Sequence, residues 1–401
     1  MRTLFFLFIL SLVSCSSVVE EKVSLWAKPI EDYLKLGKDN FGETFDKSIS
    51  TLEVFDNMLW FGYGDTRVNM GTLAPIEFRK FESINNTNYS KTKVLNENHK
   101  TPQRSEYDSG EERVIPFKLI NGTLWQAGYD STNQDELYSQ SLPSEKKLIQ
   151  GNVFKLEKLN EDYVFKKYRN INGGEHVHDI AFFNKKFFAV GSGADNREEW
   201  ENGFVYRYIW ESDDSGKNFK TFYRKTFDRK NFGDTRFRAL LSTDNALYVF
   251  GYLDPKPYGL NRSPINLVIN KEMKIAKIHS KLSDLLVWKT YQLSSNQGLI
   301  IGNVGGGISK TFFVSSNKLL ELTSWDNLRV VYVNKSTQGK WLLLTGDGNK
   351  NESFEIYQFT QQRPDSINKI YDLGKNKFCS IANWQNKIFL GSCDGKIYRI
   401  K

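Results

Sequence analysis

One short pattern recurs seven times along this chain of 401 residues. Each copy begins with a turn rich in Asn, Asp or Gly and continues with a short run of large apolar residues. A glycine and a polar loop end the copy. Short β-branched and aromatic runs between such turns are typical of β-strands. The glycines that mark the seven copies are Gly62, Gly128, Gly191, Gly251, Gly302, Gly346 and Gly391.

The distance between successive marker glycines predicts the fold. The last two intervals are 44 and 45 residues, and the earlier ones rise to 66. A repeat of roughly 40–50 residues with four strands is typical of a β-propeller, in which each repeat forms one blade. We attribute the longer intervals to loops at 83–110 and 131–152, which are polar and poor in strand-forming residues. The sequence therefore predicts an all-β, seven-bladed propeller of four-stranded antiparallel blades over residues 26–401.

The composition fits this fold and excludes other classes of protein. An aromatic content of 14% is too high for a disordered chain, and three cysteines are too few for a disulfide-rich miniprotein. Only one long apolar run is present, at the start of the chain, so a multi-span membrane protein is also excluded.

The third copy can be divided into a complete blade, with strands at 177–183, 187–191, 204–211 and 219–227. Ser212, Asp214, Gly216 and Phe219 lie between its last two strands. This segment resembles the Asp box, Ser-x-Asp-x-Gly-x-x-aromatic, of sialidase-like and sortilin-like propellers. The resemblance implies a structural hairpin in which Asp214 accepts backbone N–H groups, Gly216 has a positive φ and Phe219 packs into the blade.

The two ends of the propeller are expected to meet. The last copy ends on its third strand at Lys401, so the final blade lacks a strand. We expect residues between Trp26 and Phe45 to supply it, because ring closure removes exposed strand edges.

The N-terminus predicts export and lipid anchoring. Leu4 to Val13 is apolar apart from one serine, which suits a signal-peptide core but is too short for a membrane span. The run ends in Leu-Val-Ser-Cys at Cys15, which resembles a bacterial lipobox. The resemblance implies a signal peptide over 1–14, lipidation of Cys15, a tether over 15–25 and attachment to the cell envelope, with Ser17 favouring the outer membrane. An ordinary secretory signal that ends near a cysteine is the alternative.

Cys379 and Cys393 flank one hairpin-like segment. In an oxidising compartment they could form a disulfide, or they could remain two buried thiols. Either state gives them a structural role, and two cysteines alone do not make a zinc site.

Two polar segments lie where propellers usually bind ligands. One is 62–71, with Asp65, Arg67 and Asn69, and the other is 173–179, with His176, His178 and Asp179. These segments resemble those of uncharacterised exported bacterial propellers, a resemblance that implies fold and not function. His176 and His178 lie two apart in a strand and so project from the same face. With Glu175 or Asp179 they are weak candidates for a metal site, and a hydrogen-bonded histidine pair is the alternative.

Basic residues recur at one level of the aligned repeats. His176 corresponds to Lys47, Arg113 and Arg236 in other copies, and Lys289 and Arg329 lie within two residues of that level. This alignment predicts a basic ring that attracts an anionic ligand, such as an acidic glycan or a phosphate group. The alternative is a set of solvated strand ends whose cations pair with carboxylates such as Glu111 and Glu112.

An enzyme of the sialidase type is a second hypothesis. Arg67, Arg113 and Arg236 could clamp a carboxylate, with Asp65 as the acid/base residue. The Phe-Arg-Ile-Pro motif of that family is absent, since Arg113 begins only Arg-Val-Ile-Pro. We therefore predict a monomeric, non-catalytic binding protein for an anionic glycan or an envelope protein, without a cofactor and without nucleic acid. A sialidase-like hydrolase and a scaffold for envelope assembly are the alternatives.

Overall fold

The structure is a computed structural model, and it describes most of the chain outside the N-terminus. The described ranges are 23–42, 44–67, 74–98, 104–130, 146–213, 215–228, 233–257, 262–322, 329–336, 339–346 and 353–401. The predicted signal peptide, Cys15, Asn69 and Asp214 lie outside these ranges. No helix of the described part is both long and apolar enough to cross a membrane.

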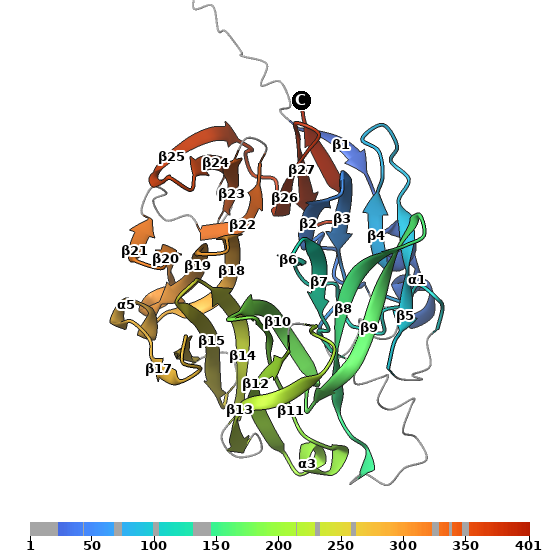
Figure 1. Ribbon diagram of the computed structural model, residues 1–401. Coiled ribbons are helices and arrows are strands. Elements are labelled where there is room, and N and C mark those ends of the chain that lie inside the picture. The colour runs from blue at the N-terminus through green and yellow to red at the C-terminus, as the bar shows by residue number, and fades with distance from the viewer. Residues whose placement is uncertain are drawn as a thin grey trace, which may run out of the picture.

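The described residues form a β-propeller, in which antiparallel sheets surround a central axis (Figure 1). Five sheets have four strands each, and one sheet has eight. The eight-stranded sheet comprises β2 (Thr51–Phe55), β3 (Met58–Gly62), β4 (Phe78–Phe81), β5 (Ser90–Asn96), β6 (Lys118–Ile120), β7 (Thr123–Ala127), β8 (Gln150–Leu159) and β9 (Asp162–Asn172).

The four-stranded sheets follow one another in chain order. Two of them consist of β10 (His176–Phe183), β11 (Lys186–Gly193), β12 (Phe204–Ser212) and β13 (Phe219–Asp228), and of β14 (Gly233–Ser242), β15 (Ala246–Pro255), β16 (Ser263–Asn270) and β17 (Ile275–Lys277). The next two consist of β18 (Leu286–Ser294), β19 (Gln297–Val304), β20 (Ile308–Ser315) and β21 (Lys318–Leu322), and of β22 (Arg329–Lys335), β23 (Lys340–Gly346), β24 (Glu355–Thr360) and β25 (Arg363–Asp372). The last consists of β26 (Phe378–Trp384), β27 (Lys387–Ser392), β28 (Ile397–Ile400) and β1 (Val23–Ala27).

The eight-stranded sheet corrects one expectation from the sequence. Its strand order is β2-β3-β4-β5-β9-β8-β7-β6, so two sets of four strands are joined through their outermost strands. The joint is a parallel pairing of β5 with β9, from Lys93 opposite Val164 to Asn96 opposite Lys167. The segment 83–110, expected to be a loop, therefore contains a strand, because β9 gives β5 a partner that the sequence does not reveal.

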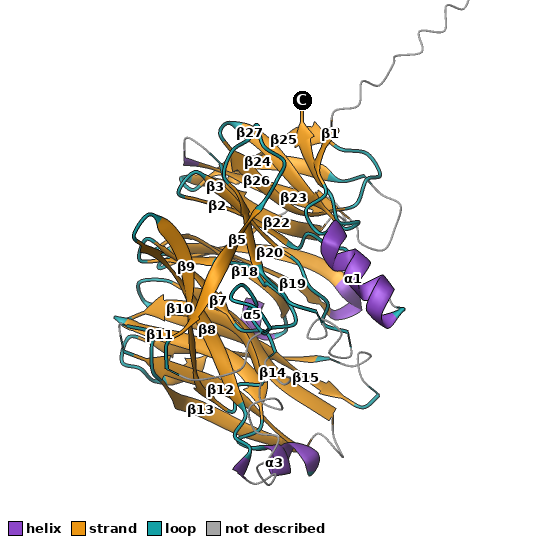
Figure 2. Cartoon of the chain, turned by 90° about the vertical axis from the view of Figure 1, so that its right-hand side faces the viewer, coloured by secondary structure: helices purple, strands orange, loops and turns teal. Residues whose placement is uncertain are grey.

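An N-terminal strand closes the ring, as expected, but it begins three residues before the expected segment and ends near its start. β1 pairs antiparallel with β28, from Val23 opposite Ile400 to Ala27 opposite Ile397. The closing strand thus begins inside the segment assigned to the tether. Most of the segment predicted to supply it forms helix α1 (Glu31–Phe41) instead. Figure 2 shows α1 beside the strands, and buried Arg79 of β4 fixes it with two hydrogen bonds of 2.8 and 2.7 Å to Asp32.

The core is divided into clusters between neighbouring sheets. One cluster joins Trp125 of β7 to Phe187 of β11 and Trp210 of β12, and another joins Phe188 of β11 to Val249 of β15. Trp288 in β18 is 37% exposed. The other tryptophans in predicted strands are buried, namely Trp60, Trp125, Trp341 and Trp384. The short helices α3 (Arg197–Glu201) and α5 (Ser280–Ser283) and the 3-10 turn η3 (Gly305–Gly307) lie in loops.

Candidate functional site

The innermost strands share a feature that sets the geometry of the axial face. In β10, β14, β18, β22 and β26 the ladder register shifts by one residue near the start of the strand. In four of these strands the shift is next to the residue that pairs with the marker glycine of the neighbouring strand. In β22 it lies one residue pair further along. A β-bulge of this kind inserts an unpaired residue and bends the strand. The residues at the bulges are His178, Arg238, Trp288, Val331 and Cys379.

Four cations gather around the axis at this level, and we call them the axial cluster: Arg113, Arg238, Lys289 and Arg329. Burial, together with the positive charges of Arg113, Arg329 and Arg238, lowers the pKa of Lys289 to about 7. The Lys289 Nζ atom donates a hydrogen bond of 3.1 Å to the carbonyl of Val331. Among the described residues, no carboxylate forms an ion pair with any of the four cations. The predicted basic ring is therefore present in part, with Arg238 as an additional member.

The other predicted members of the ring have separate environments. Lys47 is exposed, and no described contact joins it to the axial cluster. Arg236 forms an ion pair with Asp234, and its guanidinium lies 5.9 Å from the centre of the Tyr252 ring. Burial would lower the pKa of Arg236, but the Asp234 carboxylate outweighs burial and raises it. Arg236 is thus a locally neutralised cation beside the cluster.

Tyr332 occupies the axis next to the axial cluster. The Lys289 Nζ lies 5.1 Å from the centre of its ring. The Tyr332 hydroxyl reaches from β22 to β2, where it bonds to the Thr51 hydroxyl and, at 3.3 Å, to the Leu52 carbonyl. Tyr332 is 2% exposed. Its hydroxyl therefore ties two inner strands together across the axis beside the cations.

A histidine and two carboxylates form a second cluster on the same face. His176 Nε2 lies 3.0 Å from Asp130 Oδ2, and His176 Nδ1 lies 3.7 Å from Glu175 Oε2. The Trp200 indole donates a 3.1 Å hydrogen bond to the same Glu175 oxygen. Burial would lower the pKa of His176, but the carboxylates of Asp130 and Glu175 outweigh burial and raise it. One possible metal-binding atom from each of Asp130, Glu175 and His176 lies within 4.8 Å of the other two.

His178 and Asp179 do not join His176 as predicted ligands of a metal. The rings of His176 and His178 stack with centroids 5.7 Å apart. Burial, together with the charge of Arg236, lowers the pKa of His178 well below its usual value. Asp179 instead accepts a 2.8 Å hydrogen bond from the Leu240 backbone and pairs with Lys118 at 3.1 Å. Asp179 therefore ties β10 to β14 and β6, which is a structural role.

Asp65 organises the loop at the end of β3. Its buried carboxylate accepts a 2.7 Å hydrogen bond from the backbone of Asp46 and bonds from the backbone and side chain of Arg67. Burial would raise the pKa of Asp65, but these bonds outweigh burial and lower it. A carboxyl group with a lowered pKa is a poor general acid. Arg67 and Arg236, the two outer members of the predicted arginine clamp, each form an ion pair with an aspartate two positions earlier in the sequence.

Glu111 and Glu112, considered as partners of the basic ring, lie in different surroundings. Glu111 accepts hydrogen bonds from Asn152 and from the Asp130 backbone, and burial raises its pKa to about 7. Glu112 is 1% exposed, and its Oε1 has no hydrogen-bond partner among the described residues. Burial, with the negative charge of Asp130, raises the pKa of Glu112 to about 8.

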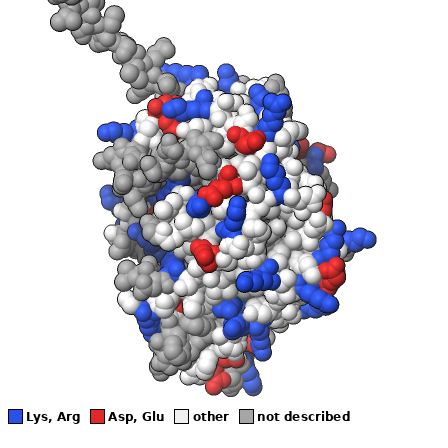
Figure 3. Space-filling model, turned by 90° about the vertical axis from the view of Figure 1, so that its left-hand side faces the viewer, with Lys and Arg blue, Asp and Glu red and all other residues white. Residues whose placement is uncertain are grey.

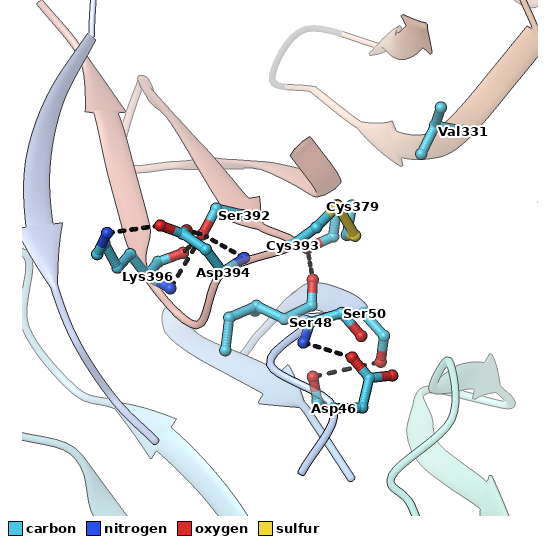
Figure 4. Close-up of a disulfide and its surroundings, with 12 residues drawn as sticks. Asp46, Ser48, Ser50, Val331, Cys379, Ser392, Cys393, Asp394 and Lys396 are labelled. Carbon is cyan, nitrogen blue, oxygen red and sulfur yellow. Dashed lines mark hydrogen bonds and ion pairs between the residues drawn. A yellow bond between two sulfur atoms is a disulfide. The ribbon is translucent and has the colours of Figure 1, made fainter. Parts of the chain in front are cut away.

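The structure joins Cys379 and Cys393 by a disulfide, so of the two open alternatives it contains the bridge (Figure 4). Cys379 is the residue at the bulge of β26, and the Cys393 backbone donates a 3.1 Å hydrogen bond to Lys377. The bridge thus holds the bulged start of an inner strand to the segment that follows β27.

We expect loss of this disulfide to reduce stability. Replacing both Cys379 and Cys393 by Ala should lower the free energy of unfolding by about 2–4 kcal/mol, because the bridge closes a loop of roughly 15 residues in the unfolded chain. Urea unfolding of the variant and the wild type measures the difference. Dithiothreitol should lower the wild type to the level of the variant and leave the variant unchanged. Equal stability of the two oxidised proteins would contradict the prediction.

β12 and β13 pair antiparallel from Ser212 opposite Phe219, so a hairpin joins them where the sequence placed one. Gly216 has a φ of +65°, and Phe219 is buried in the cluster that contains Trp125. A Cβ on Gly216 would lie 2.7 Å from the Trp125 ring. The described acceptor in the turn is Asp213, which receives a 2.9 Å hydrogen bond from the Ser215 backbone. Ser212 is buried at the end of β12.

No protein-family model matches the chain, and no curated protein matches it. Among solved structures, the chain is similar to the β-propeller domain of the Trilobed protease from Pyrococcus furiosus, with 10% identity, coverage of 89% of this chain and 97% of that chain, and a TM-score of 0.45. It is similar to YCF48 from Cyanidioschyzon merolae, with 10% identity, coverage of 88% and 96%, and a TM-score of 0.42. It is also similar to an acylaminoacyl peptidase, with 9% identity, coverage of 94% and 54%, and a TM-score of 0.46. Similarity at this level carries no information on function.

Proposed function

We propose that this protein is a non-catalytic binding propeller of the bacterial cell envelope, and that its axial cluster binds an anionic glycan. The observation that carries the proposal is the environment of Lys289. Three guanidinium groups act on this buried amine, and no described carboxylate forms an ion pair with any of the four cations. Like charges held together in this way destabilise the folded protein unless an anion neutralises them.

The surroundings of the cluster favour a glycan over a small inorganic anion. Trp288, which precedes Lys289, is 37% exposed, and its indole donates a 2.9 Å hydrogen bond to Asn303. An exposed, fixed indole offers a flat apolar face of the kind on which a sugar ring packs. The outer side of the ring at the left of Figure 1 instead carries Lys and Arg interspersed with Asp and Glu (Figure 3). The concentration of cations at the axis is therefore the feature that selects an anion.

The proposal also covers the number of blades, the hairpin type and the N-terminus, for which sequence patterns are the main support. We propose that the eight-stranded sheet comprises two blades joined at β5 and β9, which gives seven blades with the five other sheets. We also propose that the hairpin at Ser212–Phe219 belongs to the Asp-box type. The N-terminal pattern supports export, lipidation of Cys15 and attachment of a monomer to the outer membrane.

Isothermal titration calorimetry with the full-length protein tests the binding function. Trigalacturonate, an acidic trisaccharide, should bind with a Kd of about 1–100 μM in 50 mM NaCl, and galactotriose, which is neutral, should not bind. Raising NaCl to 0.5 M should weaken binding because salt screens the cluster. Arg238→Ala should weaken binding at least tenfold, whereas Arg363→Ala, in outer strand β25, should not change it.

Four results would contradict this function. Equal binding of the two trisaccharides would exclude charge selection, and an equal effect of the two arginine variants would exclude the axial cluster. Turnover of trigalacturonate during the titration, detected by chromatography of the products, would show that the protein is an enzyme. Binding of no glycan at all would favour an envelope protein as the partner.

A further inference from the structure

We propose that Asp130, Glu175 and His176 bind a divalent transition-metal ion, and that zinc is the ion that fits them best. The site lies on the axial face where the end of β7 meets the start of β10. It is separate from the axial cluster and does not depend on the glycan-binding function. The sequence pointed to His176 and Glu175 but not to Asp130, which comes from a different copy of the repeat.

The backbone holds the three side chains together. Asp130 follows β7, and Glu175 and His176 lie at the start of β10. The Val177 backbone donates a 3.0 Å hydrogen bond to the Gly128 carbonyl, which fixes these two segments side by side. Donor atoms from the three side chains lie within 4.8 Å of one another, and His176 Nε2 is already 3.0 Å from Asp130 Oδ2. Tetrahedral zinc, with bonds of about 2.0–2.2 Å, needs donors about 3.3 Å apart. Asp130 lies at Nε2 of the imidazole and Glu175 at Nδ1, so the Glu175 or the His176 side chain must rotate before both carboxylates and one ring nitrogen can bind the same ion.

A second observation indicates that this place needs a cation. Glu112 is 1% exposed, its Oε1 has no hydrogen-bond partner among the described residues, and its carboxyl lies within electrostatic reach of Asp130 and His176. Glu112 therefore adds a buried carboxyl group beside the three donors. A divalent ion held by Asp130, Glu175 and His176 would stabilise the ionised form of this carboxyl group.

The chemistry of the donors selects the metal. An imidazole nitrogen with two carboxylate oxygens suits zinc and similar transition metals, whereas magnesium and calcium favour sets made only of oxygen. Three protein ligands leave a fourth position for water or for a ligand oxygen. The Trp200 indole bonds to Glu175, and the Asp130 backbone bonds to the Glu111 carboxylate, so both carboxylate ligands are held in place from outside the site.

Metal binding is measured on the full-length protein after dialysis against a chelator and removal of the chelator. Zn²⁺ titrated in competition with a chromophoric chelator should bind one ion per chain with a Kd below about 1 μM. Co²⁺ in place of zinc should give visible d–d absorption bands of a site with nitrogen and oxygen ligands. His176→Gln and Asp130→Asn should each weaken Zn²⁺ binding by at least 100-fold.

His279→Asn is the matched control. His279 caps the short helix α5 and is exposed, and asparagine can replace it as a cap. This variant should bind Zn²⁺ like the wild type. If His176→Gln does not fold, as judged by circular dichroism, Glu175→Gln takes its place with the same expected loss. The proposal is overturned if the wild type binds Zn²⁺ with a Kd above about 100 μM, or if the site variants and the control bind it equally.

Discussion

Gly191→Ala is expected to lower the free energy of unfolding by about 3 kcal/mol or more, the largest loss that we expect from an added methyl group at any glycine in the described part of the chain. Gly191 lies in β11 opposite Val177, directly beside the bulge of β10. A Cβ at this position would lie 1.8 Å from the carbonyl oxygen of His176. Because that oxygen belongs to the backbone of an inner strand, it cannot move aside without displacing β10.

Gly305→Ala is the control for this effect. Gly305 has no heavy atom within 4 Å of an added Cβ, and its φ lies outside the positive region that disfavours alanine. Its unfolding free energy should change by no more than about 0.5 kcal/mol. Urea unfolding followed by tryptophan fluorescence measures both variants. Equal stability of Gly191→Ala and Gly305→Ala would show that the inner strand can relax and that the glycine is not required there.

The same contact explains why the repeat was readable in the sequence. A Cβ on Gly251 would lie 2.3 Å from the Arg236 carbonyl, and one on Gly302 would lie 2.6 Å from the Leu286 carbonyl. The second strand of these blades thus passes too close to the bulged inner strand for any side chain. In the other copies, different neighbours leave no room for a Cβ: Gly62 faces Thr51, Gly128 faces Asn152, Gly346 faces Phe354 and Gly391 faces Ser380. The glycine recurs because each copy is crowded at this point, and its spacing predicted the propeller. The sequence did not predict β5 as a strand, because its seven residues include only two apolar ones, and one of its two neighbours, β9, lies about 70 positions away.

The candidate site was predictable only in part, and the bulges account for the difference. Alignment of the repeats on their glycines made Arg236 the basic residue of its blade, but Arg238, the residue at the bulge, is the one within electrostatic reach of Lys289. Asp130 and His176 come from separate repeats, so no local motif joins them. Asp65 looked like a free acid in the sequence, and only the fold shows that Asp46 and Arg67 bind it.

Lys289→Met is expected to weaken trigalacturonate binding at pH 6 by about 10- to 100-fold and to remove most of its dependence on pH. Burial and the neighbouring guanidinium groups lower the pKa of Lys289 to about 7, so the amine is mostly charged at pH 6 and mostly neutral at pH 8. An anion favours the charged form. Wild-type affinity should therefore fall about tenfold from pH 6 to pH 8, and binding at pH 8 should take up nearly one proton.

Calorimetry in HEPES and in Tris, which differ in ionisation enthalpy, measures this proton uptake. Lys277→Met is the control, because Lys277 is exposed in outer strand β17 and its loss removes the same charge. The control should keep both the affinity and the proton uptake of the wild type. Unchanged pH dependence in Lys289→Met would assign the titration to another group, such as His176 or Glu112, and would remove Lys289 from the binding site.

The stability of Lys289→Met separates lost binding from lost folding. The pKa of Lys289 is lower in the folded protein than its ordinary value of 10.5, so the folded state holds fewer protons than the unfolded state between about pH 7 and pH 10.5. Wild-type stability should therefore rise with pH across this window. Methionine removes the charge, and the relief of repulsion from three arginines should outweigh the lost hydrogen bond to Val331 by about 1 kcal/mol at pH 6. A variant that unfolds at higher urea yet no longer binds the glycan would show that the cations are kept together for the ligand and at a cost to the fold.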